Sequence, residues 1–170
     1  FSGLELRHQE LLDIGSGIGG IGYYLAREHG ARVWGLEVRE WMAVYARQST
    51  PDELIGSVEF LTYDDNGNIP LPTSSIDLAY SKGVLAYIED KGSLFTEIAR
   101  VLRRDGLICM IDWLAPPELG KASERLPQGE TLHKETVRSY EEMLMACGFS
   151  DVEFHDLNES YLTYVQALVA

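Results

Sequence analysis

The sequence predicts an α/β fold: a doubly wound, mostly parallel sheet of seven strands with helices on both faces. Two observations carry this prediction. Short apolar runs alternate with longer amphipathic segments along almost the whole chain. The last two strand-like runs are separated by too few residues for a crossover helix, so we expect the sheet to end in a C-terminal antiparallel hairpin.

The expected strands are short apolar runs bounded by turn-forming residues. They cover residues 11–14, 31–38, 58–63, 76–81, 107–114, 151–157 and 161–169. The run 107–114, LICMIDWL, is almost continuously apolar, which is typical of a strand buried on both faces of a parallel sheet. Asn158 and Glu159 supply the turn inside the expected C-terminal hairpin.

The expected helices carry apolar residues at helical spacing. They cover residues 4–10, 18–29, 40–48, 90–104 and 134–146. In the second of these, Ile18, Ile21 and Leu25 share a face, and Gly30 ends the helix. The helix 4–10 would run into the first strand without a Gly, Pro or Asn turn residue. Either the turn has an unusually plain sequence or residues are absent at that junction, and we favour the second.

Length, charge and cysteine content narrow the class of protein. A chain of 170 residues suits a single domain, so residues 1–170 are expected to form one. The formal net charge of −13 argues against a domain that grips nucleic-acid phosphates or anionic membranes. No apolar run is long enough to cross a membrane. Cys109 and Cys147 are expected to be buried thiols in a reducing compartment, which favours the cytoplasm.

The sharpest motif is DIGSGIGG at residues 13–20, which follows a predicted strand and opens a predicted helix. Glycines at positions 15 and 17 permit a sharp turn and let a ligand approach the backbone without a Cβ atom in the way. The helix behind the loop offers free N–H groups and the positive end of its dipole. The motif therefore predicts a cofactor site at the carboxyl end of the first strand.

Two cofactors fit this loop, and both need an acid at the end of the second strand. Glu37 would accept hydrogen bonds from the two ribose hydroxyls of a dinucleotide or of S-adenosylmethionine (SAM). Two further acids favour SAM. Asp13 precedes the loop, where a carboxylate can hold a cationic amino-acid end, and Asp64 follows the third strand, where it can accept the adenine amino hydrogens.

With these residues in place, the sequence resembles class I SAM-dependent methyltransferases over nearly its whole length. The likeness rests on motifs in the family's order: LLDIGSGIGG, LE at 36–37, VEFLTYDD at 58–65, IDLAYSKGVLAYIED at 76–90 and LRRDGLICMIDW at 102–113. Within the class, it is most similar to the phosphoethanolamine or phosphobase N-methyltransferases, through FSGLE at the start, SKGVLAYI at 81–88 and SYEEMLMACGF at 139–149. The resemblance implies the Rossmann-like methyltransferase fold.

The same resemblance implies which residues hold the cofactor. They are Asp13, Gly15, Gly17, Glu37, Val38, Asp64, Asp65, Ser81 and Lys82. Gly15 and Gly17 would flank the methionine moiety, and Val38 and Asp65 would contact the adenine ring or its edge. Ser81 and Lys82 would line the cofactor after the fourth strand. Asp65 stands where the family usually has an apolar residue.

The acceptor half departs from the pattern of the phosphobase enzymes. Their catalytic tyrosine lies on an N-terminal lid that would precede Phe1, so we expect that lid to be missing here. Their catalytic histidine is replaced by Tyr87, and Gly83 replaces the acid that would meet the amine. Tyr87 is therefore the candidate catalytic residue, through a hydrogen bond to the acceptor.

Other candidate acceptor residues come from their place on the strands. Tyr87, Asp112 and Trp113 would lie at the carboxyl ends of the fourth and fifth strands, where ligands bind in open α/β sheets. Trp113 offers either a cation–π wall for an amine or ordinary core packing. His133, next to the proline-rich segment 115–128 expected to be a loop or lid, is a weaker candidate for a base. The histidines are scattered, and no metal site is predicted.

The leading hypothesis is a cytoplasmic enzyme that transfers a methyl group from SAM to a nitrogen or oxygen of a small molecule by in-line displacement. The alternative is a non-catalytic or degenerate SAM-binding domain of a larger phosphobase methyltransferase. A dinucleotide oxidoreductase comes third. The acidic net charge disfavours nucleic-acid acceptors and favours a small, cationic one.

Overall fold

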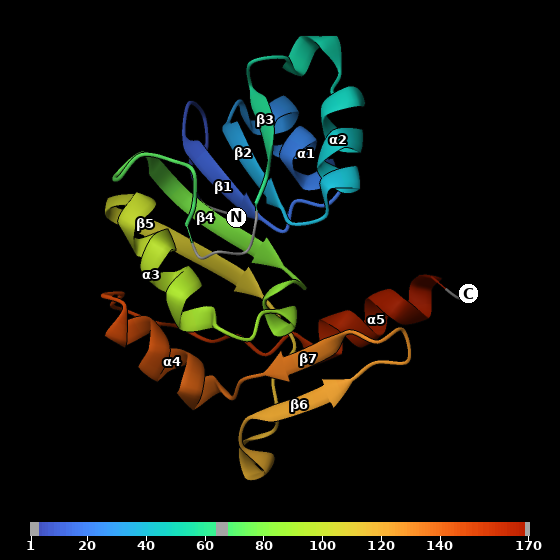
Figure 1. The fold of residues 1–170 in the computed structure, drawn as a ribbon, viewed down its shortest axis with the longest axis vertical. Helices are drawn as coiled ribbons and strands as arrows, with labels where there is room; N and C mark the ends of the chain where they lie inside the picture. Colours follow the sequence, from blue (N-terminus) through green and yellow to red (C-terminus); the bar gives the residue numbers. More distant parts are fainter. Residues whose placement is uncertain (1–3, 64–67, 169–170) are drawn as a thin grey trace.

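The computed structural model describes residues 4–63 and 68–168, with side chains up to residue 163. Its centre is a five-stranded parallel sheet in the order β3-β2-β1-β4-β5 (Figure 1). The strands are β1 (Glu10–Ile14), β2 (Arg32–Glu37), β3 (Val58–Thr62), β4 (Ile76–Lys82) and β5 (Leu102–Ile111). The predicted Rossmann-like architecture with a mostly parallel sheet is confirmed, but the main sheet has five strands and not seven.

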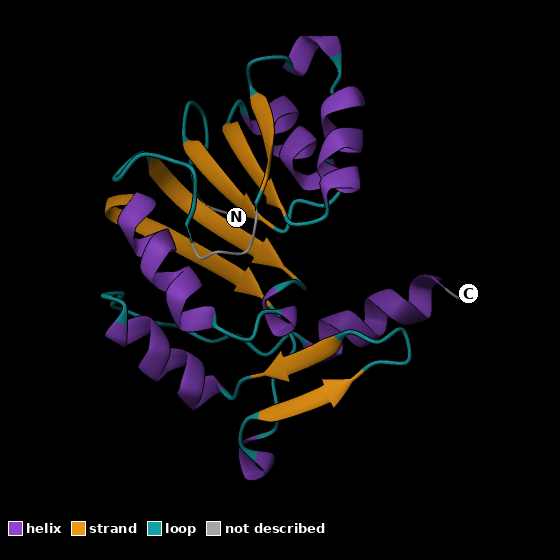
Figure 2. Cartoon of the chain, in the orientation of Figure 1, coloured by secondary structure: helices purple, strands orange, loops and turns teal. Residues whose placement is uncertain are grey.

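Helices cover both faces of this sheet (Figure 2). The helices of the first face are α1 (Gly20–His29) and α2 (Glu40–Gln48), and those of the second face are α3 (Lys91–Val101) and α4 (Val137–Ala146). Single 3₁₀ turns are η1 (Asp52–Leu54), η2 (Leu85–Tyr87) and η3 (Pro117–Leu119). The strand β1 shows why two layers form, because Leu11 packs into the cluster under α1 and α2 while Leu12 packs into the cluster under α3 and α4.

The strand β5 is an edge strand, which corrects the expectation that it is buried on both faces. Ile108 and Met110 pack against the core, but Leu107 and Ile111 on the other face are 49% and 48% exposed. Cys109 is exposed as well, so the prediction of two buried cysteines is wrong for this one. The physical reason is that the helices on that face, α1 and α2, pack mainly over β2 and β3, and that no further strand pairs with the outer edge of β5 within the described residues.

The predicted C-terminal hairpin is wrong. Residues 152–157 form no regular element, and the following run is the helix α5 (Asn158–Leu168). An acid two residues upstream starts this helix, because Asp156 Oδ1 accepts the Asn158 N–H at 2.8 Å. A strand pattern that is rich in aromatic residues also suits a helix when no partner strand fixes its conformation.

An antiparallel hairpin forms instead over residues 122–134. It begins inside the segment 115–128 expected to be a loop or lid and extends beyond it. Its strands are β6 (Ala122–Arg125) and β7 (Thr131–Lys134). The Leu126 N–H donates to the Glu130 carbonyl and the Gly129 N–H to the Leu126 carbonyl, which closes the turn. The hairpin lies beyond the carboxyl ends of β4 and β5 (Figure 1).

The approach to β1 is a turn and not the expected helix. His8 adopts a φ of +62°, and the Gln9 N–H donates to the Leu6 carbonyl at 3.1 Å. Leu6 is buried in the core under α1. The turn therefore forms without a Gly, Pro or Asn residue. Burial of Leu6 and a hydrogen bond from the His8 N–H to the Gly30 carbonyl fix the chain in this conformation.

The edge position of β5 predicts a difference between two isoleucines in strands. Ile76→Ala removes a fully buried side chain of β4 and should lower the free energy of unfolding by about 2–5 kcal/mol. Ile111→Ala removes a half-exposed side chain of β5 and should cost about 1 kcal/mol or less. Urea unfolding of both variants measures this difference, and equal losses would contradict the edge position.

Candidate functional site

The carboxyl ends of β1, β2 and β4 meet at one edge of the sheet. Ile14 at the end of β1 is in register with Leu36 of β2 and with Ser81 of β4. The described residues of the predicted cofactor site lie in or directly after these strands. Asp64 and Asp65, the two predicted adenine contacts after β3, lie outside the described residues.

The glycine loop takes the conformation that its sequence predicts. Gly15 and Gly17 have φ values of +73° and +55°, in the left-handed region that favours glycine. The Gly15 and Ser16 N–H groups both donate to the Leu36 carbonyl, at 2.9 and 3.0 Å. A Cβ at Gly15 would lie 2.3 Å from Val84 Cγ2, whereas a Cβ at Gly17 would meet open space. The first glycine therefore serves close packing, and the second leaves the loop open.

Glu37 holds this loop from the neighbouring strand. Its carboxylate is buried, with Oε2 accepting the Gly17 N–H at 2.8 Å and Oε1 accepting the Arg39 N–H at 2.9 Å. An ionised carboxylate offers about four acceptor positions, so each oxygen keeps a lone pair for a further donor. Glu37 can therefore stabilise the loop and accept ligand hydroxyls at the same time.

Asp13 is a buried carboxyl group below the loop. It is 3% exposed, and its Oδ2 has no hydrogen-bond partner among the described residues. Burial raises the pKa of Asp13 to about 7, a hydrogen bond with Tyr80 opposes that rise, and the nearby Glu37 adds to it. Burial also raises the pKa of the Tyr80 phenol above its usual value. A carboxylate in this position lacks a compensating charge.

The hydroxyl of Ser16 is a second buried polar group without a hydrogen-bond partner in the described part of the chain. Buried polar atoms without partners are rare and call for an explanation such as a bound ligand or water. Asp13 lies two residues before Gly15, and Ser16 is part of the glycine loop. An ionised carboxylate and a hydroxyl oxygen can both accept hydrogen bonds from a ligand with N–H donors and positive charge, which are properties of the amino-acid end of SAM.

The remaining predicted cofactor residues differ in exposure. Val38, directly after β2, is 53% exposed. Ser81 is buried, and its hydroxyl donates to the Ile14 carbonyl at 3.1 Å, which ties β4 to the start of the glycine loop. Lys82 ends β4 and is exposed. Ser81 therefore supports the backbone, while Val38 and Lys82 have accessible side chains.

The candidate acceptor side is formed by η2 and the residues after β5. Tyr87 ends η2 and is 44% exposed. Asp112 is not free, because Oδ2 accepts the Tyr140 hydroxyl at 2.7 Å and Oδ1 accepts the Ala86 N–H at 3.2 Å. It therefore braces η2 below Tyr87. Trp113 is half-exposed and makes an edge-to-face contact with Tyr161, with 5.1 Å between ring centroids.

Lys91 is a structural residue of the site that the sequence did not reveal. It is almost completely buried, and its Nζ donates to the carbonyls of Ile88 and His133 at 2.6 Å each. Burial lowers the pKa of Lys91, and Glu135 and Asp112 oppose that change. The side chain joins the end of η2 to β7, so the hairpin is fixed against the candidate acceptor residues. A lysine at the start of an amphipathic helix carries no signal of such burial.

An ion pair fastens the other end of the hairpin. Arg39, which precedes α2, pairs with Glu130 in the turn of the hairpin. The hairpin therefore bridges from the candidate acceptor side to the loop beside Glu37. His133, the candidate base, lies in β7 and is half-buried, and its carbonyl is the group that Lys91 contacts.

The described residues contain no group of three or more His, Cys, Asp or Glu side chains that could hold a metal ion. Among the same residues, no helix has the length and apolar character needed to cross a membrane.

A parallel sheet with a glycine loop after β1 and an acid at the end of β2 defines the class of nucleotide-cofactor-binding α/β domains. A family model described as a methyltransferase domain matches residues 12–110, which is more than half of the chain. The chain therefore belongs to the SAM-dependent methyltransferase family.

Individual relatives agree with this assignment. Phosphoethanolamine N-methyltransferase 1 from Zea mays is 32% identical over 166 residues, which cover 93% of this chain and 31% of the relative. A phosphoethanolamine N-methyltransferase 2 from Haemonchus contortus, solved with S-adenosyl-L-methionine, superposes with a TM-score of 0.80 at 22% identity, covering 95% of this chain and 37% of that one. A SAM-dependent methyltransferase from Mesorhizobium loti superposes with a TM-score of 0.71 at 25% identity, covering 88% and 78%. The chain spans about a third of the length of the plant phosphoethanolamine N-methyltransferases it matches.

The buried Asp13 predicts a pH-dependent stability. Its pKa in the folded state, about 7, lies above the ordinary value of 3.8, so the folded state holds the proton more tightly than the unfolded chain does. Stability should therefore fall as the pH rises from about 4 to about 7. Between pH 5 and pH 8 the wild type should lose about 2–3 kcal/mol more than Asp13→Asn.

Urea unfolding at several pH values measures this difference. Glu28→Gln, at an exposed position of α1, is the matched control and should keep the wild-type pH dependence. An Asp13→Asn variant with the same pH dependence as the wild type would show that Asp13 is ionised in the folded state throughout.

Proposed function

We propose that this chain binds SAM at the carboxyl edge of the sheet and transfers its methyl group to a nitrogen or oxygen of a small molecule. The observation that carries the proposal is the pair of buried acceptor atoms without partners, Asp13 Oδ2 and Ser16 Oγ, beside the glycine loop of a methyltransferase-family chain. A cationic ligand with N–H donors relieves both. Nothing in the described residues favours the non-catalytic alternative.

Each cofactor residue receives a role from its chemistry. The glycine loop and Asp13 would hold the methionine end, since the open side of Gly17 admits a ligand and the carboxylate matches its ammonium group. Glu37 would accept the ribose hydroxyls with its remaining lone pairs. The exposed Val38 would contact the adenine ring, and the exposed Lys82 and the backbone beside Ser81 would line the cofactor. We further assign the adenine amino group to Asp64 and the edge of the ring to Asp65.

Methyl transfer needs positioning more than acid–base chemistry. When bound, the cofactor supplies a methyl group on a sulfonium that is its own leaving group. The protein therefore has to align the acceptor for in-line displacement and to exclude water. Tyr87 would hydrogen-bond the acceptor from η2, which Asp112 holds in place. Half-exposed Trp113 would offer its ring to a cationic amine.

The acceptor is proposed to be a small amine. Relatives named phosphoethanolamine N-methyltransferases support an amine, and a net charge of −13 favours a cationic molecule over nucleic acid. The replacement of the family's acid by Gly83 and of its histidine by Tyr87 argues for a changed acceptor geometry. We also propose that residues 1–170 act as one domain and that the protein is cytoplasmic, as the scarcity of cysteines predicts.

Removing the Glu37 carboxylate should weaken cofactor binding. Glu37→Ala leaves the ribose hydroxyls without an acceptor, so the free energy of SAM binding should drop by about 1–3 kcal/mol. Isothermal titration calorimetry measures the dissociation constant, with Glu40→Ala, an exposed acid at the start of α2, as the matched control. Tight NAD binding without SAM binding would overturn the cofactor assignment, and an unchanged constant in Glu37→Ala would remove Glu37 from the site.

Labelled SAM tests the transfer itself. The protein is incubated with amines, phosphoamines and hydroxy compounds, and at least one amine is expected to receive the label. With that acceptor, Tyr87→Phe should lower kcat/KM by about tenfold through the lost hydrogen bond. Tyr45→Phe, a half-exposed tyrosine of α2, is the control. No transfer to any acceptor would favour the non-catalytic alternative.

A further inference from the structure

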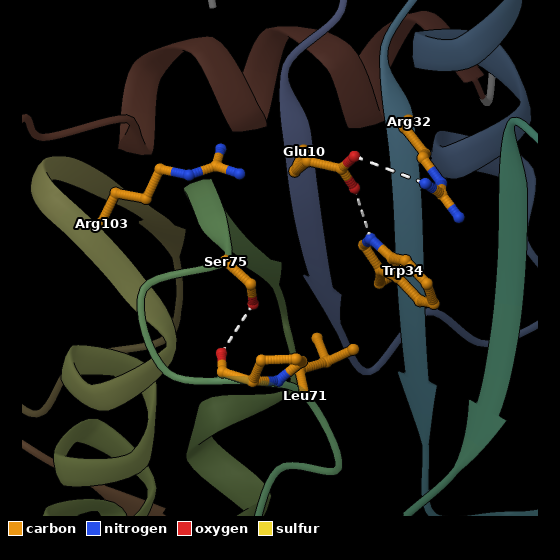
Figure 3. A pocket seen from close by; sticks show the side chains of 7 residues that line it. Glu10, Arg32, Trp34, Leu71, Ser75 and Arg103 are labelled. Atoms are coloured by element: carbon orange, nitrogen blue, oxygen red, sulfur yellow. Dashed lines mark hydrogen bonds and ion pairs between the residues drawn. The ribbon is translucent and has the colours of Figure 1, made fainter.

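A cavity opens at the amino ends of the strands, on the opposite edge from the glycine loop (Figure 3). Its volume is about 370 Å³, and it is lined by Glu10, Arg32, Trp34, Leu71, Pro72, Ser75 and Arg103. The strand β1 begins at Glu10, so the whole strand separates this cavity from the glycine loop. Five residues of parallel strand span about 16 Å. The cavity is therefore distinct from the candidate cofactor site.

The cavity exists because the connection from β3 to β4 returns across the sheet as a loop over residues 68–75, without a helix in its described part. Leu71, Pro72 and Ser75 of this loop line the cavity. Arg100 of α3 fixes the loop, because its Nη1 donates to the Leu71 carbonyl at 3.0 Å. The cavity is thus held open by an anchored segment.

One part of the cavity lining is apolar and is formed by Trp34, Leu71 and Pro72. Trp34 lies at one side, and its indole N–H donates to Glu10 Oε2 at 2.6 Å, which fixes the ring. The guanidinium of Arg32 lies over this ring, 4.7 Å from its centroid. Leu71 and Pro72 also line the cavity, and Trp34 packs against the core cluster that contains Leu71. A flat apolar group could lie against this lining.

The charged groups around the cavity are not equally available. Glu10 already accepts the Trp34 indole and faces Arg32 at 3.6 Å. Asp77 of β4 accepts the Glu10 N–H at 2.8 Å and pairs with Arg103 at 2.5 Å. A guanidinium has five N–H donors, and the side chains of Arg32 and Arg103 are 48% and 43% exposed. The carboxylates are thus engaged, while both arginines keep donors for a ligand.

We propose that this cavity binds a small organic anion with a flat apolar body, such as an aromatic carboxylate or sulfonate. The aromatic body lies against Trp34 and Leu71, and the anionic group accepts hydrogen bonds from Arg103. The volume is in the range of small-molecule sites, about 300–1,000 Å³. The binding site is independent of the cofactor site at the other edge.

Calorimetry with two naphthalene probes of opposite charge tests the proposal. 2-Naphthalenesulfonate should bind to the whole chain with one-to-one stoichiometry, while 2-naphthylmethylammonium should bind at least tenfold more weakly, about what one charged hydrogen bond contributes. Arg103→Gln should weaken sulfonate binding by about tenfold, and Arg103→Lys, which keeps the charge but loses the planar fork, should fall between. Arg27→Gln is the matched control, an arginine 49% exposed on α1 that pairs with Glu53.

Three outcomes would overturn the proposal. The first is equal binding of both probes, and the second is sulfonate binding that Arg103→Gln leaves unchanged. The third is an equal loss in Arg27→Gln, which would show general attraction to surface arginines. If Arg103→Gln fails to fold by circular dichroism, Trp34→Leu serves as the second variant. It keeps both arginines and should abolish the quenching of tryptophan fluorescence that the bound naphthalene causes.

Discussion

The carboxylate of Glu37 fastens the glycine loop to the end of β2, and the geometry of the cofactor edge depends on it. One oxygen holds the Gly17 N–H and the other holds the Arg39 N–H, so loop, strand end and the start of α2 share a single group. The Leu36 carbonyl completes the arrangement by accepting two N–H groups from the other side of the loop. The left-handed turn at Gly17 is therefore fixed by partners from a neighbouring strand, and a ligand would meet a preformed edge.

The other half of the candidate site is built from buried polar contacts between segments far apart in the sequence. Asp112 connects Tyr140 of α4 with the backbone of η2, and Lys91 connects η2 with β7. Each of these groups is satisfied, which distinguishes them from Asp13. Satisfied polar networks rigidify a fold, whereas an orphaned acceptor marks a place for a ligand. Asp112 and Lys91 therefore hold the site together, whereas Asp13 keeps an acceptor atom that a ligand can use.

The sequence predicted β1 to β4 and the glycine loop. Strands buried on two faces are visible as short apolar runs, and left-handed backbone positions are visible as glycines. The environment of β5 and the fate of the C-terminal run could not be predicted in this way. Apolar residues such as Leu107 and Ile111 look the same in a central strand and in an edge strand. The buried contacts of Lys91 were equally invisible, since they depend on residues 42 positions away and on the hairpin.

The outer edge of β5 has a consequence for the protein in solution. An edge strand offers a row of main-chain donors and acceptors to any passing chain. In its amino half, β5 carries Arg104 and Asp105, both exposed, and Asp105 adopts a φ of +63° that breaks the regular extension. Charges and local twist of this kind oppose the addition of a strand from another molecule. These two residues therefore act as gatekeepers against aggregation, and protect an edge whose other half is apolar.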